Sequence, residues 1–424
     1  MFIERSAARV RFSRLAFLVA GLLPLLLLAA WAMHRGSAAH RDAVRAAWQV
    51  AVGLPLDVAS ITHPRPGVVA ATGVVVRSPA GRVVLEVPAV EVESAATEDR
   101  LRIRGVRLDA AAAAVLGGLA GEWLRSDARH PRNCLVDAVD VVCDAAEPRG
   151  DGPASLRIEC VGRGPTRAIR VVRDDGDEVR VVRTLGGDGA SGGQRYEVEG
   201  RLSTPVPAGV VAAAMGLPND VAEALPAQAT IMGDLRAVAE DAGWSGSGSG
   251  RIEGVDIGRC SAAVHATAAG IANIAIQRFV WRDGRLVDVA VRCDCGPGWV
   301  DAALFDRLVI ALGCRPGPAF QSSAATQAFD AASCALELDG SRVVVRPAGV
   351  TEGLAASRGA VLLHPPAAPV AFERFAWMMS PPAATFVPAA GPGAWLMSIV
   401  PAPAAAQGMQ RAGNPSGREG PRGF

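Results

Sequence analysis

The cysteines of this 424-residue chain are its most obvious candidates for site chemistry. All of them follow the first hydrophobic segment, and their even number permits disulfide bonds. Cys293 and Cys295 form a C-x-C pair, which a β-strand would place on one face. No C-x-x-C pair is present, so neither a zinc ribbon nor a thioredoxin-like site is indicated. Disulfides, buried thiols and a metal site stay open, in that order of preference. The eight are Cys134, Cys143, Cys160, Cys260, Cys293, Cys295, Cys314 and Cys334.

Two short motifs resemble ligand sites but fit turns better. Residues 187–192 match G-x-G-x-x-G, yet a dinucleotide site needs a helix directly afterwards, and the strand-like run 195–202 follows instead. The acidic residues of 174–178 could offer oxygen ligands to calcium, but their spacing misses the EF-hand pattern. Valine-rich arms flank that cluster symmetrically, as in a hairpin. We predict a flexible hairpin loop at 187–192 and a solvated turn at 174–178.

The remaining residue types give no catalytic constellation. No two of the six histidines share the spacing of metal ligands, and no G-x-S-x-G elbow marks an activated serine. The chain contains no lysine, which excludes Schiff-base chemistry, pyridoxal phosphate attachment and a Walker lysine. We therefore predict a protein that is not an enzyme, with no catalytic, cofactor-binding or metal-binding residue. An anchored hydrolase with a non-standard site is the remaining catalytic alternative.

The charge pattern excludes one further class of partner. The formal net charge is +1, and the arginines are spread along the chain rather than gathered into one run. Neither feature favours nucleic acid as a partner.

Residues 15–33 form a run of nineteen without a charge. At about 1.5 Å per residue a helix of this length spans roughly 28 Å, close to the hydrocarbon thickness of a bilayer. Four arginines precede the run within a basic tail, residues 1–14, which favours an inner-membrane anchor with the N-terminus in the cytoplasm and the body outside. A cleaved signal peptide is the alternative, with Ala30 and Ala32 as small cleavage-site residues.

The body of the chain reads as strands that alternate with a period of two, joined by turns. Such alternation predicts antiparallel sheet with one wet face, and Asp283-Gly284 predicts a hairpin turn. The fold class is therefore α+β, mostly antiparallel with short helices and one transmembrane helix. We expect a β-rich region at 40–185 with a helix at 110–125, and another at 194–380 with helices at 207–216 and 299–312. Residues 186–193 and 245–250 read as linkers, and 381–424 as a Pro/Gly/Ala-rich tail, disordered at least from 401.

The order of these elements resembles the AsmA-like superfamily of bacterial envelope proteins. The resemblance covers roughly residues 1–125 and 245–315, and it rests on the anchor, the stretches 53–58, 64–69 and 73–76, and the rhythm of the strands that follow. It implies a long, curved antiparallel sheet with an apolar concave face that can shelter lipid chains, and a role in lipid transfer or envelope biogenesis without catalysis. The family offers no point motif, so no ligand residue carries over, and this chain is short for a bridge across an envelope.

These observations predict a non-enzymatic, membrane-anchored envelope protein whose β-groove binds or organises lipid. The second hypothesis is an anchored structural scaffold that binds an envelope protein partner and no lipid. The third is the anchored hydrolase. Whether the exported body carries bound lipid when folded separates the first two.

Overall fold

A computed structural model shows two compact units in the chain, and each is described by itself. Unit 1 comprises residues 1–107 and 132–142, and unit 2 comprises residues 108–131 and 143–424. The structure describes residues 7–78, 80–126, 132–143, 153–185, 193–214, 228–240, 243–262, 265–349, 352–380, 394, 397 and 398. The predicted loop at 187–192 and nearly all of the predicted tail lie outside these residues.

Unit 1 begins with a continuous helical segment made of α1 (Ala7–Phe17), a π-helical turn η1 (Leu18–Leu22) and α2 (Leu23–Gly36). The π turn ends just before Pro24, whose ring lacks an N–H and displaces the preceding turn of an α-helix. Among the described residues, Arg11–Gly36 is the one helical stretch long and apolar enough to cross a membrane, and none of its most apolar window is buried. The predicted segment 15–33 lies inside it.

The sheet of unit 1 follows a second helix. Ser37 caps α3 (Ala38–Val52), because its Oγ accepts the N–H of His40 at 3.2 Å, and Gly53 ends it with a left-handed backbone. The strands β1 (Leu56–Thr62), β2 (Val68–Arg77), β3 (Val83–Ser94) and β4 (Glu98–Arg104) form an antiparallel meander, and a short β5 (Arg107–Leu108) follows. β6 (Asn133–Cys143) then pairs with β4 in parallel, as a strand does after a long connection.

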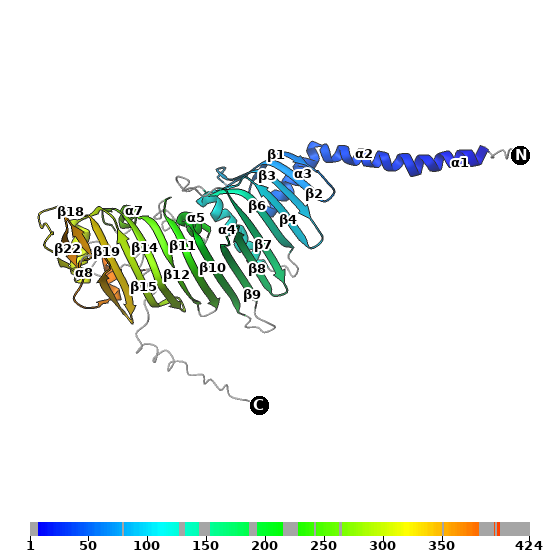
Figure 1. Cartoon of the computed structure of the whole chain (residues 1–424). Helices are drawn as coiled ribbons and strands as arrows, with labels where there is room; N and C mark the ends of the chain where they lie inside the picture. The colour runs from blue at the N-terminus through cyan, green and yellow to red at the C-terminus, as the bar shows by residue number, and fades with distance from the viewer. Residues whose placement is uncertain are drawn as a thin grey trace, which may run out of the picture. The chain divides into compact units, whose positions relative to one another are not determined.

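Unit 2 is built on a long antiparallel meander that starts after α4 (Ala110–Arg125), a helix with the predicted bounds. Consecutive strands pair from β7 through β12, then β14 and β15 (Figure 1). Asp283 and Gly284 both have positive φ and form the predicted turn between β14 and β15. The strands are β7 (Ala154–Arg163), β8 (Thr166–Arg173), β9 (Glu178–Leu185), β10 (Gln194–Pro207), β11 (Thr230–Glu240), β12 (Gly243–Asp256), β14 (Ile271–Arg282) and β15 (Arg285–Cys295).

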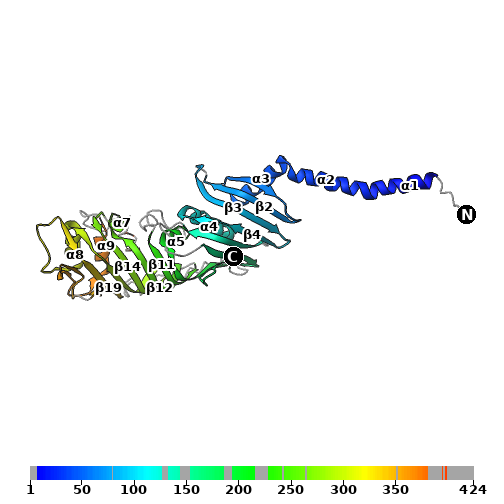
Figure 2. The same ribbon diagram turned by 45° about the horizontal axis from the view of Figure 1, so that its top comes forward.

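Helices occur in alternate connections of this meander. α5 (Ala208–Ala214) follows β10, α7 (Ile257–Ala262) follows β12, and α8 (Ala302–Leu312) lies between β15 and its next partner β19. Because an antiparallel chain reverses at each strand, alternate connections return to the same edge of the sheet. Figures 1 and 2 accordingly show α5 and α7 along one edge, while the opposite edge holds hairpins.

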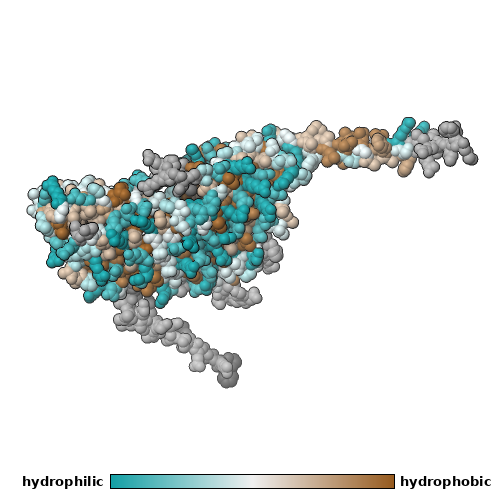
Figure 3. Space-filling model, viewed as in Figure 1, coloured by the Kyte–Doolittle hydropathy of each residue, from teal (hydrophilic) through white to brown (hydrophobic). Residues whose placement is uncertain are grey.

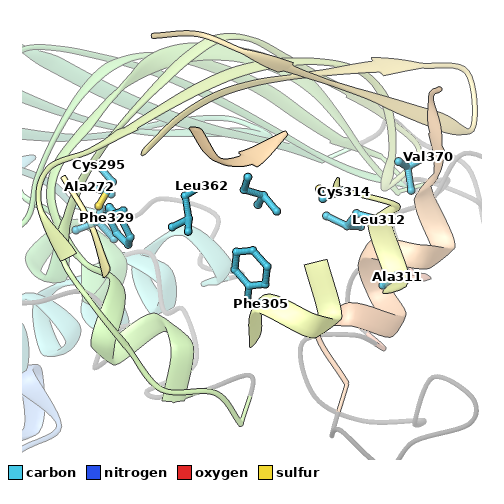
Figure 4. Packing of buried hydrophobic residues seen from close by; sticks show 11 residues of the cluster. Ala272, Cys295, Phe305, Ala311, Leu312, Cys314, Phe329, Leu362 and Val370 are labelled. Atoms are coloured by element: carbon cyan, nitrogen blue, oxygen red, sulfur yellow. The ribbon is translucent and has the colours of Figure 1, made fainter. Parts of the chain in front are cut away.

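The C-terminal end of the sheet wraps around the largest buried cluster. β19 (Ala331–Asp339) pairs with β15, with β20 (Arg342–Pro347) and with β21 (Ala355–Ser357). In Figure 4 the strands arch over the side chains of this cluster, among them Phe305 of α8 and Leu362 of β22. The smaller elements are β13 (Ala268–Ala269), β16 (Gly298–Asp301) and β18 (Thr326–Phe329), which form a separate small sheet, then β17 (Arg315–Pro316), β22 (Ala360–His364), β23 (Val370–Ala371) and α9 (Phe372–Met378).

The structure confirms the coarse fold class and corrects two helix starts and one predicted linker. The third predicted helix begins at Ala302 rather than at 299, because residues 299–301 pair in β16 and Asp301 caps the helix through the N–H of Leu304 at 2.6 Å. The predicted linker 245–250 is instead the middle of β12. The helix predicted at 207–216 is α5, which begins after Pro207.

Candidate functional site

One face of the unit 2 sheet, the outer face, carries a ladder of exposed ion pairs. Arg195 of β10 pairs with Glu240 of β11 at 3.0 Å, and Arg236 of β11 pairs with Glu199 of β10 at 3.0 Å. Hydrophilic side chains cover much of the body seen in Figure 3. Exposed pairs of this kind contribute only about 0–1 kcal/mol each, so the ladder mainly keeps this face in water.

A shallow hollow of about 480 Å³ lies on the same outer face, over β7, β8 and β9. Three of its five charged lining residues pair with one another: Arg170 contacts Glu178 at 2.7 Å and Glu159 at 3.7 Å. Part of the charge that lines the hollow is therefore compensated within the protein.

The opposite, inner face is apolar across six strands, as the register of the strands shows. Directly opposed residues of neighbouring strands point to the same side of a sheet. One row runs Val181, Val198, Ala237, Gly246, Trp281 and Leu286 from β9 to β15, and a second runs Val179, Gly200, Leu235, Gly248, Phe279 and Val289. The inner face is therefore continuous from β9 to β15.

Much of this inner face keeps partial contact with solvent. Val198, Leu202, Leu235 and Ile276 are half-buried, and Trp244 on β12 is 47% exposed. An exposed apolar surface of this kind on a folded protein indicates an interaction site. We take the inner face of β10–β12 and β14 as the candidate functional site.

Glycines shape the middle of the site. Gly246, Gly248 and Gly250 on β12 face inward, while the alternating serines of the same stretch face outward. The Trp281 ring lies over Gly246, where an added Cβ would be 2.6 Å from its Cζ2 atom. The stretch 245–250 has the composition of a linker but forms a strand. Its serines make one solvent-exposed polar face, and its glycines leave the other face without side chains.

Buried arginines hold α4 over the inner face of β8 and β9. Arg183 donates from Nη1 to the carbonyl of Leu124 at 2.7 Å, and Arg167 donates from Nε to the carbonyl of Ser126 at 2.9 Å. Both carbonyls belong to the C-terminal end of α4, where unpaired C=O groups and the helix dipole favour a cation. The C-terminal end of α4 therefore compensates the charges of the two arginines that are buried in the apolar inner face.

The two C-terminal helices cap each other in the same way. Arg307 of α8 donates to the carbonyls of Met378 and Ser380 at 3.2 and 3.3 Å, at the end of α9. In return, Arg374 of α9 donates to the carbonyl of Ala311 at 3.3 Å, near the end of α8. The inner face is thus covered at both ends, by α4 over β8 and β9 and by α8 with α9 at the C-terminal end. The strands β10–β12 lie between these two covered parts.

These arginines are the residues that sequence reasoning missed, although a signal for them exists. Arg167 lies two residues from Ile169 on β8, and Arg183 lies two residues from Val181 on β9. Because Ile169 and Val181 face inward, both arginines face inward too. An arginine at an inward position predicts a buried cation that needs several acceptors. Which acceptors these are depends on where α4 lies, and the strand pattern does not contain that information.

The acidic turn is the predicted β8–β9 hairpin, but it is not solvated throughout. Asp177 is only 3% exposed, and its carboxylate pairs with Arg173 at 2.9 Å and accepts the N–H of Ser203 at 2.5 Å. Hydrogen bonds from Arg173 and then from Thr204 hold the pKa of Asp175 well below its usual range. Their oxygens are thus engaged within the protein. Among the described residues, no group of three or more His, Cys, Asp or Glu side chains could hold a metal ion.

The seven cysteines whose side chains the structure describes are thiols. Cys293 and Cys295 lie on the inner face of β15, as the C-x-C spacing predicts, and both belong to the cluster beneath α8. Burial raises the pKa of Cys295 and Cys314 to about 11. Both are therefore protonated and weakly nucleophilic at neutral pH.

Two histidines meet where the helical segment joins the sheet of unit 1. The Nε2 atoms of His40 on α3 and His63, just after β1, are 2.9 Å apart, and the ring of His34 lies 5.5 Å from that of His40. One ring must donate and the other accept, so the contact requires at least one neutral imidazole. Burial, and then the positive charges of Arg35 and His40, lower the pKa of His63.

We expect unit 1 to lose stability as the pH falls below about 6.5, the pKa of an unperturbed histidine. A lowered pKa in the folded state means that the unfolded chain binds the proton more readily, so protonation of His63 favours unfolding. Thermal unfolding of the full chain between pH 7.5 and 5.5 measures this effect. His63→Gln is expected to flatten the pH dependence, whereas His265→Asn, outside this contact, leaves it unchanged. An equal pH dependence in His63→Gln would contradict the assignment.

Comparison with known proteins gives no relative: no family model, no curated protein and no solved structure matches this chain.

Proposed function

We propose that this protein is a non-enzymatic, membrane-anchored envelope protein that binds or organises lipid on the inner face of its unit 2 sheet. The observation that carries the proposal is the contrast between the two faces of one sheet. The outer face is a ladder of exposed ion pairs, and the inner face is a continuous apolar surface on which Trp244 is 47% exposed.

Acyl chains suit such a surface for a physical reason. Burying each methylene group contributes about 0.8 kcal/mol without requiring any directional contact, so a smooth apolar floor suffices. Gly246, Gly248 and Gly250 remove side chains from the middle of that floor. A small polar ligand would instead need convergent polar groups, and the inner rows from β9 to β15 are apolar.

The N-terminal helix supports the placement at a membrane. Arg11–Gly36 has the length and composition of a single span. In our proposal it anchors the protein in the inner membrane, with the N-terminus in the cytoplasm and both units outside, since the arginines before the span favour that orientation. We further propose membership of the AsmA-like superfamily, which the antiparallel sheet with an apolar, helix-flanked face supports.

The test uses a full chain with a protease recognition sequence inserted after Gly36. The chain folds in its membrane, the body is then released by cleavage without detergent, and native mass spectrometry and lipid extraction identify what it carries. We expect phospholipid or another acyl-chain ligand bound in stoichiometric amount.

Two variants of β12 make the test specific. Trp244→Glu adds a negative charge on the inner face, and Ser247→Glu adds the same charge on the outer face at an exposed position opposite Arg236. We expect Trp244→Glu to reduce bound lipid several-fold and Ser247→Glu to leave it unchanged. A folded body free of lipid, or equal loss in both variants, would overturn the proposal and favour a scaffold that binds a protein partner.

A further inference from the structure

Two cysteines far apart in the sequence are direct cross-strand neighbours in unit 2. Cys293 of β15 is registered opposite Cys334 of β19. Directly opposed residues of antiparallel strands have Cα atoms about 4.5 to 5.5 Å apart, inside the range of about 4.4 to 6.8 Å that a disulfide bond spans. Both side chains point to the same, inner face of the sheet, where Cys293 packs against the cluster beneath α8.

The two thiols already interact. A hydrogen bond joins them; it lowers the pKa of Cys293 and, together with burial, raises that of Cys334. A thiolate is the species that attacks a disulfide, so one thiol of the pair must lose its proton before the reaction starts. The neighbouring register positions differ: Cys295 lies opposite Ala332, so its strand partner carries no thiol.

We propose that Cys293 and Cys334 are an oxidation site that forms an intramolecular disulfide bond between β15 and β19. The co-reactant is a low-molecular-weight or protein disulfide. The Cys293 thiolate attacks one of its sulfurs and releases the first thiol, which leaves a mixed disulfide on Cys293. Cys334 then loses its proton and attacks the Cys293 sulfur, releasing the second thiol. One disulfide is reduced to two thiols, and the two cysteines are oxidised by two electrons.

The bond ties the two ends of the segment that carries α8. Residues 296–330, with β16, α8, β17 and β18, lie between the two cysteines in the sequence. In the unfolded chain the bond closes a loop of about 40 residues and so lowers its conformational entropy. The oxidised protein is expected to hold α8 against the inner face more firmly than the reduced one. This inference does not depend on a lipid ligand.

The experiment equilibrates the purified full chain with excess oxidised glutathione in subdenaturing urea, blocks free thiols and digests with endoproteinase Asp-N. Cleavage before aspartate separates Cys293 and Cys334 from each other and from the thiols of Cys295 and Cys314. Cys293 lies in 288–293, Cys295 in 294–300, Cys314 in 306–329 and Cys334 in 330–338. We expect peptides 288–293 and 330–338 linked, and a rise of several degrees in the unfolding temperature, which a reductant reverses.

Single variants separate this pair from the other thiols. Cys293→Ala and Cys334→Ala are expected to abolish the redox-dependent shift, while Cys295→Ala, two residues along the same strand, retains it. Recovery of peptides 288–293 and 330–338 with both thiols blocked, or linkage of either one to 294–300 or 306–329, would overturn the proposal. A shift of equal size in Cys293→Ala would do the same.

Discussion

Replacing Asp177 by alanine is expected to lower the free energy of unfolding of unit 2 by about 3–5 kcal/mol, the usual cost of removing one partner of a buried ion pair. The carboxylate is 3% exposed and pairs with Arg173 at 2.9 Å. It also accepts the N–H groups of Ser203 and Thr204, where the register of β10 against β11 shifts. Its loss would leave Arg173 and these two backbone donors without their carboxylate acceptor.

The control for this prediction is the next residue along the chain. Glu178 also pairs with an arginine, Arg170, at 2.7 Å, but both side chains are exposed. We expect Glu178→Ala to cost less than about 1 kcal/mol. Urea unfolding followed by circular dichroism measures both variants. Equal costs for the two would show that the burial of Asp177 has no energetic consequence, which contradicts the prediction.

Replacing Gly233 by alanine is expected to destabilise unit 2 by about 4 kcal/mol or more, at the extreme of single substitutions. Gly233 of β11 and Gly250 of β12 are registered opposite each other in the middle of the inner face. A Cβ added at Gly233 would lie 2.2 Å from the carbonyl oxygen of Ser249 and 2.6 Å from the Cα of Gly250. These contacts are with backbone atoms, so only a shift of the strands relieves them.

Gly200 of β10 provides the matched control on the same face. Its nearest neighbour would be a Cγ2 of Val179 at 3.8 Å from an added Cβ, an ordinary contact. Alanine also loses less conformational entropy than glycine on folding, so Gly200→Ala is expected to be neutral or slightly stabilising. The yield of folded protein and its urea midpoint distinguish the variants. A Gly233→Ala protein with the midpoint of Gly200→Ala would disprove the close approach of the strands.

Local patterns in the sequence were sufficient to predict several helices and turns. Asp109 followed by an apolar run predicts the helix found at Ala110–Arg125, because its side chain caps the N–H of Ala112 at 2.7 Å. Asp283-Gly284 predicts the hairpin between β14 and β15, since both residues readily adopt the positive φ of that turn. Each depends on neighbours within a few residues, so no distant part of the chain is needed to specify it.

Two local patterns gave the wrong element because pairing outweighed composition. Residues 245–250 alternate serine and glycine, a composition typical of a linker, yet β11 and β14 pair on both sides of the stretch. Residues 299–301 precede a helix but pair with β18 and β13, so the helix starts at Ala302. Backbone hydrogen bonds to neighbouring strands need no particular side chain, so composition carries little information about them.

The features of the candidate site likewise fall into those that the sequence determined and those that only the structure decided. The sequence by itself determined a membrane-span candidate, strands with one apolar and one charged face, and the absence of lysine chemistry. Only the tertiary structure decided which strands lie side by side, and therefore that Val198, Ala237, Gly246 and Trp281 form one row. It also decided that Cys334 lies opposite Cys293 and that Asp177 is buried beside Arg173. These contacts join residues distant in the chain, and they depend on strand register and helix placement, which packing of the whole unit sets.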